Sequence, residues 1–415
     1  MQIEVLQAGG NPEKDSPPAC LFAWAGVFFQ ITKLRPASRK AIMKRVVFLD
    51  YLRTIAIFMV LLVHSCENFY YGENGSLFLQ SPGSARWAIG IDSACRACVP
   101  LFVMASSYLL FPIKRETGDF LRKRILRVGI PFLLWCCIFM VLTHGEWGRM
   151  LFNFPMTSAG HLWFVPMLIG VYLLMPLLSP WAERVSEKEL LGWIGLWIVT
   201  TTFPFVRQLY GHLYGDGWGH IFGEGSIFKT PFLFGECHWN TFGTFYYVSG
   251  FMGYLLLGLW FRRFAPEYSW KKTLAIAIPL WLVGFSIVAG WFYFRIPTEG
   301  GFPVTKPYAC VVDLETSWEN CSLGVVMTVI AYFLVIRKMT FEGKFYKYFV
   351  LPFSEASFGI YLIHMLFLGA ICGWLSSRMN TGCTIICTAA ATFITAFLVA
   401  YPLHKIPKLG KWIAG

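Results

Sequence analysis

The sequence predicts an all-α protein, a bundle of about ten helices that cross a membrane, with both termini in the cytoplasm. Of its 415 residues, 56% are hydrophobic and 14% are charged, whereas about 25% of the residues of a soluble domain are charged. Ten apolar segments approach the length of about 20 residues that a helix needs to cross about 30 Å of hydrocarbon. The loops between them alternate between basic and non-basic composition, which predicts the orientation of the bundle.

The ten predicted spans follow one another from residue 46 to residue 403. The ninth is too long for an upright helix, and Pro352 near its start predicts a break or a tilted start at that point. We expect the spans at residues 46–66, 87–111, 128–143, 161–182, 190–206, 243–262, 272–294, 318–336, 347–375 and 383–403.

Every second loop carries several Lys or Arg residues, and the loops between them are acidic, aromatic or longer. Basic loops stay on the cytoplasmic side, so an even number of spans leaves both ends of the chain inside. This bias also accounts for the net charge of +12, and no basic stretch alternates with aromatic residues as a nucleic-acid groove would. We therefore expect membrane lipid, and no nucleic acid, as a partner. The basic segments are KLRPASRKAIMKR, IKRETGDFLRKRILR, RRFAPEYSWKK, RKMTFEGKFYK and LHKIPKLGKW.

The first 42 residues differ from the rest of the chain. They contain an apolar patch, ACLFAWAGVFFQI, which is too short to span a membrane and is followed by a basic stretch. A membrane protein would start naturally at Met43, where MKRVVFLDYLR leads into the first span. We interpret residues 1–42 as an N-terminal extension with no structural role, with an interfacial helix as the alternative. Residues 43–415 form the membrane domain.

The first span, DYLRTIAIFMVLLVHS, contains ionisable residues that lipid disfavours. Such a residue costs about 2.5 to 3.5 kcal/mol in a membrane helix, so it normally faces a protein interior or a wet cavity. Arg53 and His64 are eleven residues apart, which places both on nearly the same helix face, about 16 Å apart along the axis. Asp50 lies one turn from Arg53, and the two can form a structural salt bridge. The spacing therefore predicts two polar points at different depths of one space.

A second polar motif lies in the basic segment before Pro131. Arg124 and Arg127 would share one face of a helix, and guanidinium groups suit a pyrophosphate. Arg122 and Lys123 lie beside them, and such residues also anchor a protein at lipid headgroups. Both interpretations of this segment stay open.

Two further histidines occupy predicted spans. His161 opens the fourth span, where it could orient or deprotonate a substrate or simply lie at the membrane interface. His364 lies about 17 residues into the ninth span, and Ser357 and Tyr361 fall on the same helix face. A polar stripe of this kind either serves a site or joins helices through hydrogen bonds.

Four stretches together resemble the acyltransferase 3 family of ten-span membrane enzymes. One departure from its pattern is Ser106-Ser107, where the family has Ser-Gly, so a close backbone approach that needs glycine could be altered there. The stretch GTFYYVSGFMGYLLLG is similar to members that O-acetylate envelope polysaccharides such as enterobacterial common antigen. The four stretches are DYLRTIAIFMVLLVH, VPLFVMASSYLL with FLRKRILRVGIP, HLWFVPMLIGVYLLMPLL, and SFGIYLIHMLFL.

The resemblance implies an O-acetyltransferase of the bacterial inner membrane that moves an acetyl group from cytoplasmic acetyl-CoA to a hydroxyl of a surface or envelope glycan. It implies His64 as the catalytic base, with His161 and His364 as further catalytic candidates. Arg53 would reach the phosphates or the thioester carbonyl of the donor, and coenzyme A would also bind Arg124, Arg127 and Lys123. No metal is expected, and the spacing C-x-x-C at Cys95 and Cys98 is interpreted as helix packing.

Two other classes of protein fit the composition. A secondary transporter or lipid-linked sugar flippase would show inverted repeats and paired broken helices, and no repeat is visible in the sequence. A membrane scaffold would not need histidines in its first and ninth spans. The sequence is compatible with either direct transfer or a covalent intermediate, and with either a monomer or an oligomer.

Overall fold

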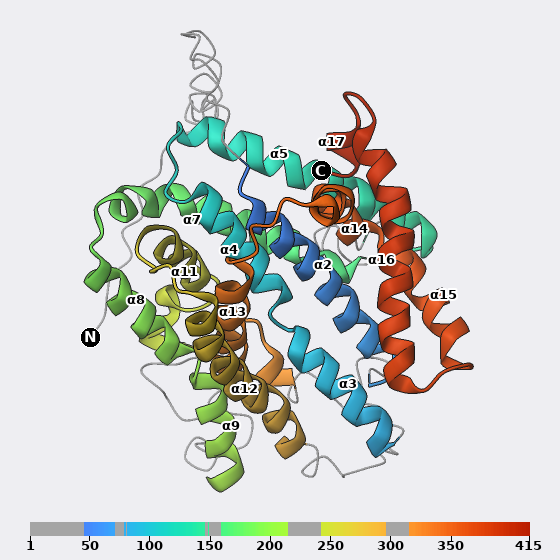
Figure 1. Ribbon diagram of the computed structural model, residues 1–415, viewed down its shortest axis with the longest axis horizontal. Coiled ribbons are helices and arrows are strands. Elements are labelled where there is room, and N and C mark those ends of the chain that lie inside the picture. The colour runs from blue at the N-terminus through green and yellow to red at the C-terminus, as the bar shows by residue number, and fades with distance from the viewer. Residues whose placement is uncertain are drawn as a thin grey trace, which may run out of the picture. The chain divides into compact units, whose positions relative to one another are not determined.

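The computed structural model describes residues 45–70, 79, 81–145, 148, 159–214, 242–295 and 315–415. The predicted extension, residues 1–42, lies outside these residues, so its role stays a prediction. The described residues form helices and no strand (Figure 1). The helices are α2 (Val47–Glu67), α3 (Pro82–Cys95), α4 (Cys98–Leu110), α5 (Thr117–Leu142), η2 (Gly160–Trp163), α7 (Phe164–Arg184), α8 (Glu187–Thr200), α9 (Phe203–Tyr214), η3 (Gly243–Val248), α11 (Met252–Arg263), α12 (Trp270–Arg295), η6 (Glu315–Trp318), α13 (Leu323–Ile336), η7 (Tyr346–Val350), α14 (Leu351–Ile363), α15 (Met365–Ser376), α16 (Thr381–Lys405) and α17 (Gly410–Ile413).

Within the described ranges, nine helices are long and apolar enough to cross a membrane, or up to ten if the bent pair α14 and α15 is one span. This confirms the predicted fold class of an all-α membrane bundle. The location of the two termini relative to the membrane stays a prediction.

Helix α2 lies inside the bundle of residues 46–415, where it contacts α3, α4, α13, α14 and α16 (Figure 1). Of its most apolar window, 67% is buried against protein, compared with 28% for α12. Small and branched side chains along α2, among them Ala56, Ile57 and Leu61, are fully buried. The polar residues of the first span therefore face protein on most sides and lie largely away from lipid.

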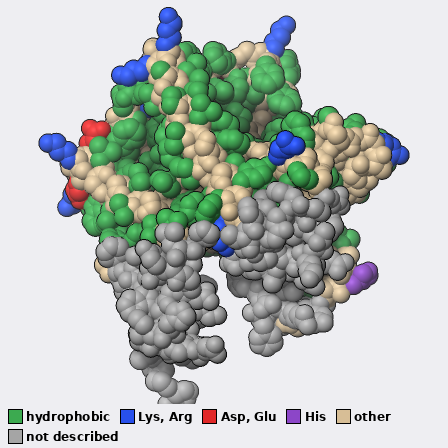
Figure 2. Space-filling view, turned by 90° about the horizontal axis from the view of Figure 1, so that it is seen from below, with side chains coloured by type: hydrophobic (Ala, Val, Ile, Leu, Met, Phe, Trp, Pro, Cys, Tyr) green, Lys and Arg blue, Asp and Glu red, His purple; other side chains and the backbone are tan. Residues whose placement is uncertain are grey.

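The outer surface carries the residues expected to meet lipid. Figure 2 shows hydrophobic side chains over much of the visible face, with several Lys and Arg side chains at its margins. Leu177 is 76% exposed and Leu398 is 64% exposed, both on candidate spans. A soluble protein would rarely leave such large apolar side chains exposed together.

The ninth predicted span does break, but the predicted position of the break was wrong. The helix axis bends by 80° between residues 346–363 and 365–376, at His364. Pro352 lies just after the π-helical turn η7, and the helical segment from Tyr346 to Ile363 runs through it without a sharp bend.

The third span also starts earlier than predicted. Residues 117–142 form the single helix α5, so Arg124 and Arg127 lie on a helix and not in a loop. Arg and Lys have high helix propensity, and their long stems let the charge reach out from an otherwise apolar helix. Pro131 lies inside α5 and does not end it.

Ser107 has a close neighbour that explains how the bundle accommodates it. Its Oγ donates a hydrogen bond of 2.6 Å to the carbonyl of Leu255 on α11. A Cβ built on Gly258 would lie 2.5 Å from the Cβ of Ser107. The close approach of α4 and α11 is therefore kept, with the glycine on the opposite helix.

We expect Gly258→Ala to lower the thermal unfolding midpoint in detergent, because the added methyl group overpacks the contact with Ser107. Overpacking of this kind lowers the free energy of unfolding by about 1 to 3 kcal/mol. Ser107→Gly in the same chain should restore most of the loss. Gly290→Ala on α12 is the matched control, since a Cβ there meets no atom within 4 Å. Equal midpoints for Gly258→Ala and the wild type would contradict this account of the contact.

Candidate active site

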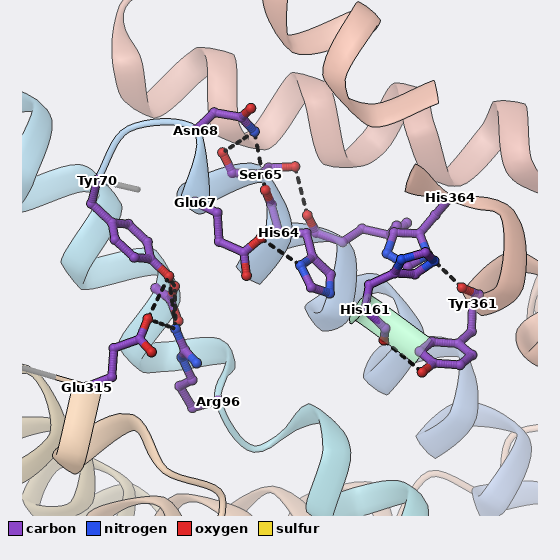
Figure 3. Close-up of polar contacts among 12 residues, drawn as sticks. His64, Ser65, Glu67, Asn68, Tyr70, Arg96, His161, Glu315, Tyr361 and His364 are labelled. Atoms are coloured by element: carbon purple, nitrogen blue, oxygen red, sulfur yellow. Dashed lines mark hydrogen bonds and ion pairs between the residues drawn. The ribbon is translucent and has the colours of Figure 1, made fainter. Parts of the chain in front are cut away.

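Three histidines from distant parts of the sequence lie side by side in the bundle (Figure 3). The rings of His64 and His364 have centroids 5.2 Å apart, and those of His161 and His364 are 5.3 Å apart. His64 comes from the last turn of α2, His161 from η2, and His364 from the junction of α14 and α15. All three histidines that the sequence suggested as catalytic are thus brought together.

Tyr361 holds two of these histidines in place. Its hydroxyl donates a hydrogen bond of 2.8 Å to the backbone carbonyl of His161. Its own carbonyl accepts a hydrogen bond of 2.7 Å from Nδ1 of His364. The ring of Phe139 lies edge-on to His161, with centroids 4.8 Å apart. The predicted companion Ser357 does not join them, since its Oγ bonds to the carbonyl of Ser354.

His64 pairs with a carboxylate that the sequence reasoning did not select. Nδ1 of His64 lies 2.8 Å from Oε2 of Glu67, one turn further along α2. A carboxylate only accepts, so Nδ1 carries a proton, and in the neutral imidazole the lone pair is at Nε2. The same carboxylate–imidazole arrangement fixes the tautomer of the catalytic base in serine proteases. Glu67 could have been found from its spacing of three residues from His64.

The other two imidazoles carry nitrogens that have no hydrogen-bond partner in the described part of the chain. These are Nε2 of His161 and Nε2 of His364, both buried. An unsatisfied buried polar atom costs about 1 to 3 kcal/mol, and such atoms in a native structure commonly mark a functional site. No group of three or more His, Cys, Asp or Glu side chains in the described ranges is placed to hold a metal ion.

A charged cluster lies near Glu67 and was also missed (Figure 3). Nη2 of Arg96 donates to Oδ2 of Asp92 at 2.9 Å and to the hydroxyl of Tyr70 at 3.1 Å. It also lies 3.9 Å from Oε1 of Glu315. The guanidinium lies 4.5 Å from the ring centroid of Trp318. The spacing of Asp92 and Arg96 within one span was a usable signal, whereas Glu315 is distant in sequence.

The charged cluster is partly open. The side chain of Arg96 is 17% exposed and that of Glu315 is 22% exposed, while Asp92 is fully buried. Glu67 is more open, with 32% of its side chain exposed. Arg96 and the His64–Glu67 pair lie in the same region of the bundle (Figure 3). Polar groups of both signs therefore border the His64–Glu67 pair.

At the other end of α2, Arg53 forms the predicted ion pair with Asp50, with Nη1 and Oδ1 3.3 Å apart. Asp50 is 1% exposed and accepts hydrogen bonds from Tyr346 at 2.8 Å and from Ser354 at 2.7 Å. The carboxylate is thus fully clamped, while 30% of the Arg53 side chain remains exposed. Arg53 can keep this salt bridge and still present part of its guanidinium to a ligand.

The basic residues of α5 have no acidic partner in the part of the chain that the structure describes. Arg122, Lys123 and Arg127 are exposed and Arg124 is half-buried. Arg127 and Arg115 both lie near enough to repel the charge of Arg124. No described ion pair or hydrogen bond joins these residues to Arg53 or to the histidines. A row of uncompensated cations on one helix is suited to an anionic ligand or to lipid headgroups.

A family model described as an acyltransferase domain matches residues 46–404 of the chain. The match covers every candidate residue described above, from Asp50 to His364. No curated protein and no solved structure matched the chain.

We expect Asp92→Asn to lower the thermal unfolding midpoint strongly, because it leaves Arg96 largely buried without its carboxylate. Breaking a buried ion pair from one side costs about 3 to 5 kcal/mol. Asp119→Asn is the control, since Asp119 is exposed on α5. If both variants unfold at the wild-type temperature, the cluster does not stabilise the bundle.

Proposed function

Because the chain belongs to the acyltransferase 3 family, we propose that it is an O-acetyltransferase of the bacterial inner membrane. It transfers an acetyl group from cytoplasmic acetyl-CoA to a hydroxyl of a cell-surface or envelope glycan. The observation that carries this proposal is the His64–Glu67 pair, a base of fixed tautomer beside two further imidazoles. Proton-coupled transporters also use His and Glu side chains inside the membrane, and it is the family match that favours an enzyme over a transporter or flippase.

In the proposed reaction, the acceptor oxygen bonds to the acetyl carbon as its proton moves to Nε2 of His64. The carbon–sulfur bond then breaks, and the coenzyme A thiolate takes one proton as it leaves. Glu67 keeps Nδ1 protonated and stabilises the positive charge that forms on the ring, as expected for a carboxylate beside a catalytic imidazole. A covalent acetyl-enzyme route would require the same proton transfers.

For the donor, we propose that Arg124, Arg127 and Lys123 bind the phosphates of acetyl-CoA and that Arg53 reaches the phosphates or the thioester carbonyl. Support comes from the uncompensated charge of the α5 residues and the partly exposed side chain of Arg53. Guanidinium groups form paired hydrogen bonds with phosphate oxygens.

For the acceptor, we propose that the glycan approaches from the end of α2 that carries Glu67. Arg96 and Glu315 border that end with partly exposed polar side chains of both signs. A sugar hydroxyl both donates and accepts hydrogen bonds, so such a mixture suits it.

The proposal is tested by incubating purified protein with isotope-labelled acetyl-CoA and the lipid-linked glycan fraction of bacterial membranes. We expect the label to appear on glycan as an alkali-labile ester, with release of free coenzyme A. Transport of glycan between vesicle leaflets without consumption of acetyl-CoA would support the flippase alternative and contradict the proposal.

We expect Arg124→Ala and Arg127→Ala each to weaken coenzyme A binding by about tenfold or more, because each substitution removes a charge-assisted hydrogen bond to phosphate. Binding by the remaining residues should weaken further as salt is added. Arg122→Ala is the matched control, being exposed on the same helix, and should change the affinity less. Unchanged affinity in the first two variants, measured by calorimetry in detergent, would identify the segment as a headgroup anchor.

We expect His64→Ala to reduce acetyl transfer by about 10² to 10⁴-fold, the usual range for a general base. Glu67→Gln should reduce it too, because an amide can donate to Nδ1 and so stabilise the wrong tautomer. Coenzyme A affinity should survive in both, since Arg53 lies about 16 Å away along α2. A folded His64→Ala protein that transfers at the normal rate would exclude His64 as the base.

A further inference from the structure

The buried histidine at the bend of the ninth span has a tautomer that its surroundings dictate. Nδ1 of His364 lies 2.7 Å from the carbonyl oxygen of Tyr361. A carbonyl oxygen only accepts, so Nδ1 is the protonated nitrogen and Nε2 carries the lone pair. His364 is fully buried, and its Nε2 has no hydrogen-bond partner in the described ranges.

His64 presents the same nitrogen in the same state. Its Nδ1 donates to Glu67, which leaves the lone pair at Nε2. The two rings are tilted by 35°, with centroids 5.2 Å apart, a separation that admits a hydrogen bond or one bridging oxygen between ring nitrogens. The lone pairs on the two Nε2 atoms cannot form a hydrogen bond with each other. A single proton placed between these nitrogens would give both of them a hydrogen-bond partner.

A purely structural role does not account for this arrangement. A histidine that serves only to join helices would use both ring nitrogens, because each unsatisfied buried one is destabilising. The bend of 80° between α14 and α15 instead directs the imidazole into the bundle, beside His64.

We propose that His364 is a second proton acceptor paired with His64 in the acetyl-transfer reaction. The proton that leaves the acceptor hydroxyl goes to Nε2 of His64, and His364 accepts it as a hydrogen bond or takes it over at its own Nε2. The positive charge on the histidine pair is then stabilised by two hydrogen-bond acceptors. Glu67 accepts from Nδ1 of His64, and the Tyr361 carbonyl accepts from Nδ1 of His364. The same proton passes to the leaving thiolate, so the pair returns to its starting state.

This inference rests on the proposed function and adds a residue to it. In this inference His364 takes part in proton transfer and does not bind the donor or the acceptor. The affinities for both substrates should therefore not depend on His364. The expected signature is a loss of turnover with unchanged binding constants, which a packing defect would not produce.

The test compares His364→Ala and His364→Gln with Thr392→Val. Thr392 is the matched control, because it is also fully buried and its Oγ1 has no partner in the described ranges. We expect both His364 variants to lower kcat by about 10²-fold, the lower end for acid–base groups. The KM for acetyl-CoA and its affinity should stay at wild-type values, and Thr392→Val should be fully active.

Added imidazole should restore part of the rate in His364→Ala, where it can occupy the vacated space, and should not help Thr392→Val. Normal kcat in His364→Gln, or a loss of kcat that tracks a loss of donor affinity and thermal stability, would overturn the inference.

A measurement on the wild-type protein is independent of activity. Nitrogen-15 NMR of histidine-labelled protein, with the His364 signal assigned by its loss in His364→Gln, should show a protonated Nδ1 and an unprotonated Nε2. The opposite tautomer would refute the pairing whatever the rates. A wild-type protein that transfers no acetyl group would instead refute the proposed function, and this inference with it.

Discussion

An ionisable group inside a membrane bundle is costly unless protein or a wet cavity surrounds it, because lipid supplies no partner. Helix α2 depends on this constraint most, since it holds Asp50 and Arg53 near one end and His64 and Glu67 near the other. At each end the partner comes from the same helix, three residues along. The ionisable residues of α2 therefore form pairs within the helix. Neighbouring segments add further hydrogen bonds, since the hydroxyls of Tyr346 and Ser354 both donate to Asp50.

This arrangement places two polar groups at opposite ends of one helix. The clamped Asp50 leaves Arg53 partly exposed near the start of α2, while the His64–Glu67 pair lies about 16 Å further along. The bend of the ninth span lies at His364, whose ring joins the second region with its centroid 5.2 Å from that of His64. We infer that the donor phosphates and the acceptor hydroxyl occupy opposite ends of α2, which suits an acyl group that starts inside the cell and ends outside.

Much of the bundle could be predicted from local sequence. Hydropathy predicted the nine spans found in the described residues, and the bent pair of α14 and α15 where the tenth was expected, because the length of an apolar run is set by the thickness of the bilayer. Helical spacing put Arg53 and His64 on one face, and an i, i+3 rule gave the Asp50–Arg53 pair. The same rule applied to His64 would have given Glu67, so that omission was avoidable.

Other features depend on contacts between segments that are distant in sequence, so no local sequence pattern predicts them. The bend lies at His364 although Pro352 is the obvious helix breaker, and the helical segment from Tyr346 to Ile363 runs through that proline. Arg96 meets Glu315 only because η6 packs near α3. Ser107 is tolerated at a close helix contact because Gly258, far along the chain, supplies the missing space. Tertiary packing decides each of these.

We infer that donor and acceptor act from opposite ends of α2. This inference is tested most directly with proteoliposomes in which the protein has one known orientation and labelled acetyl-CoA is supplied on one side only. We expect acetylated glycan to form when acetyl-CoA is present on the side of the α5 arginines, with the ester accessible to an esterase added on the opposite side. Product that forms and stays accessible on the donor side alone would contradict it.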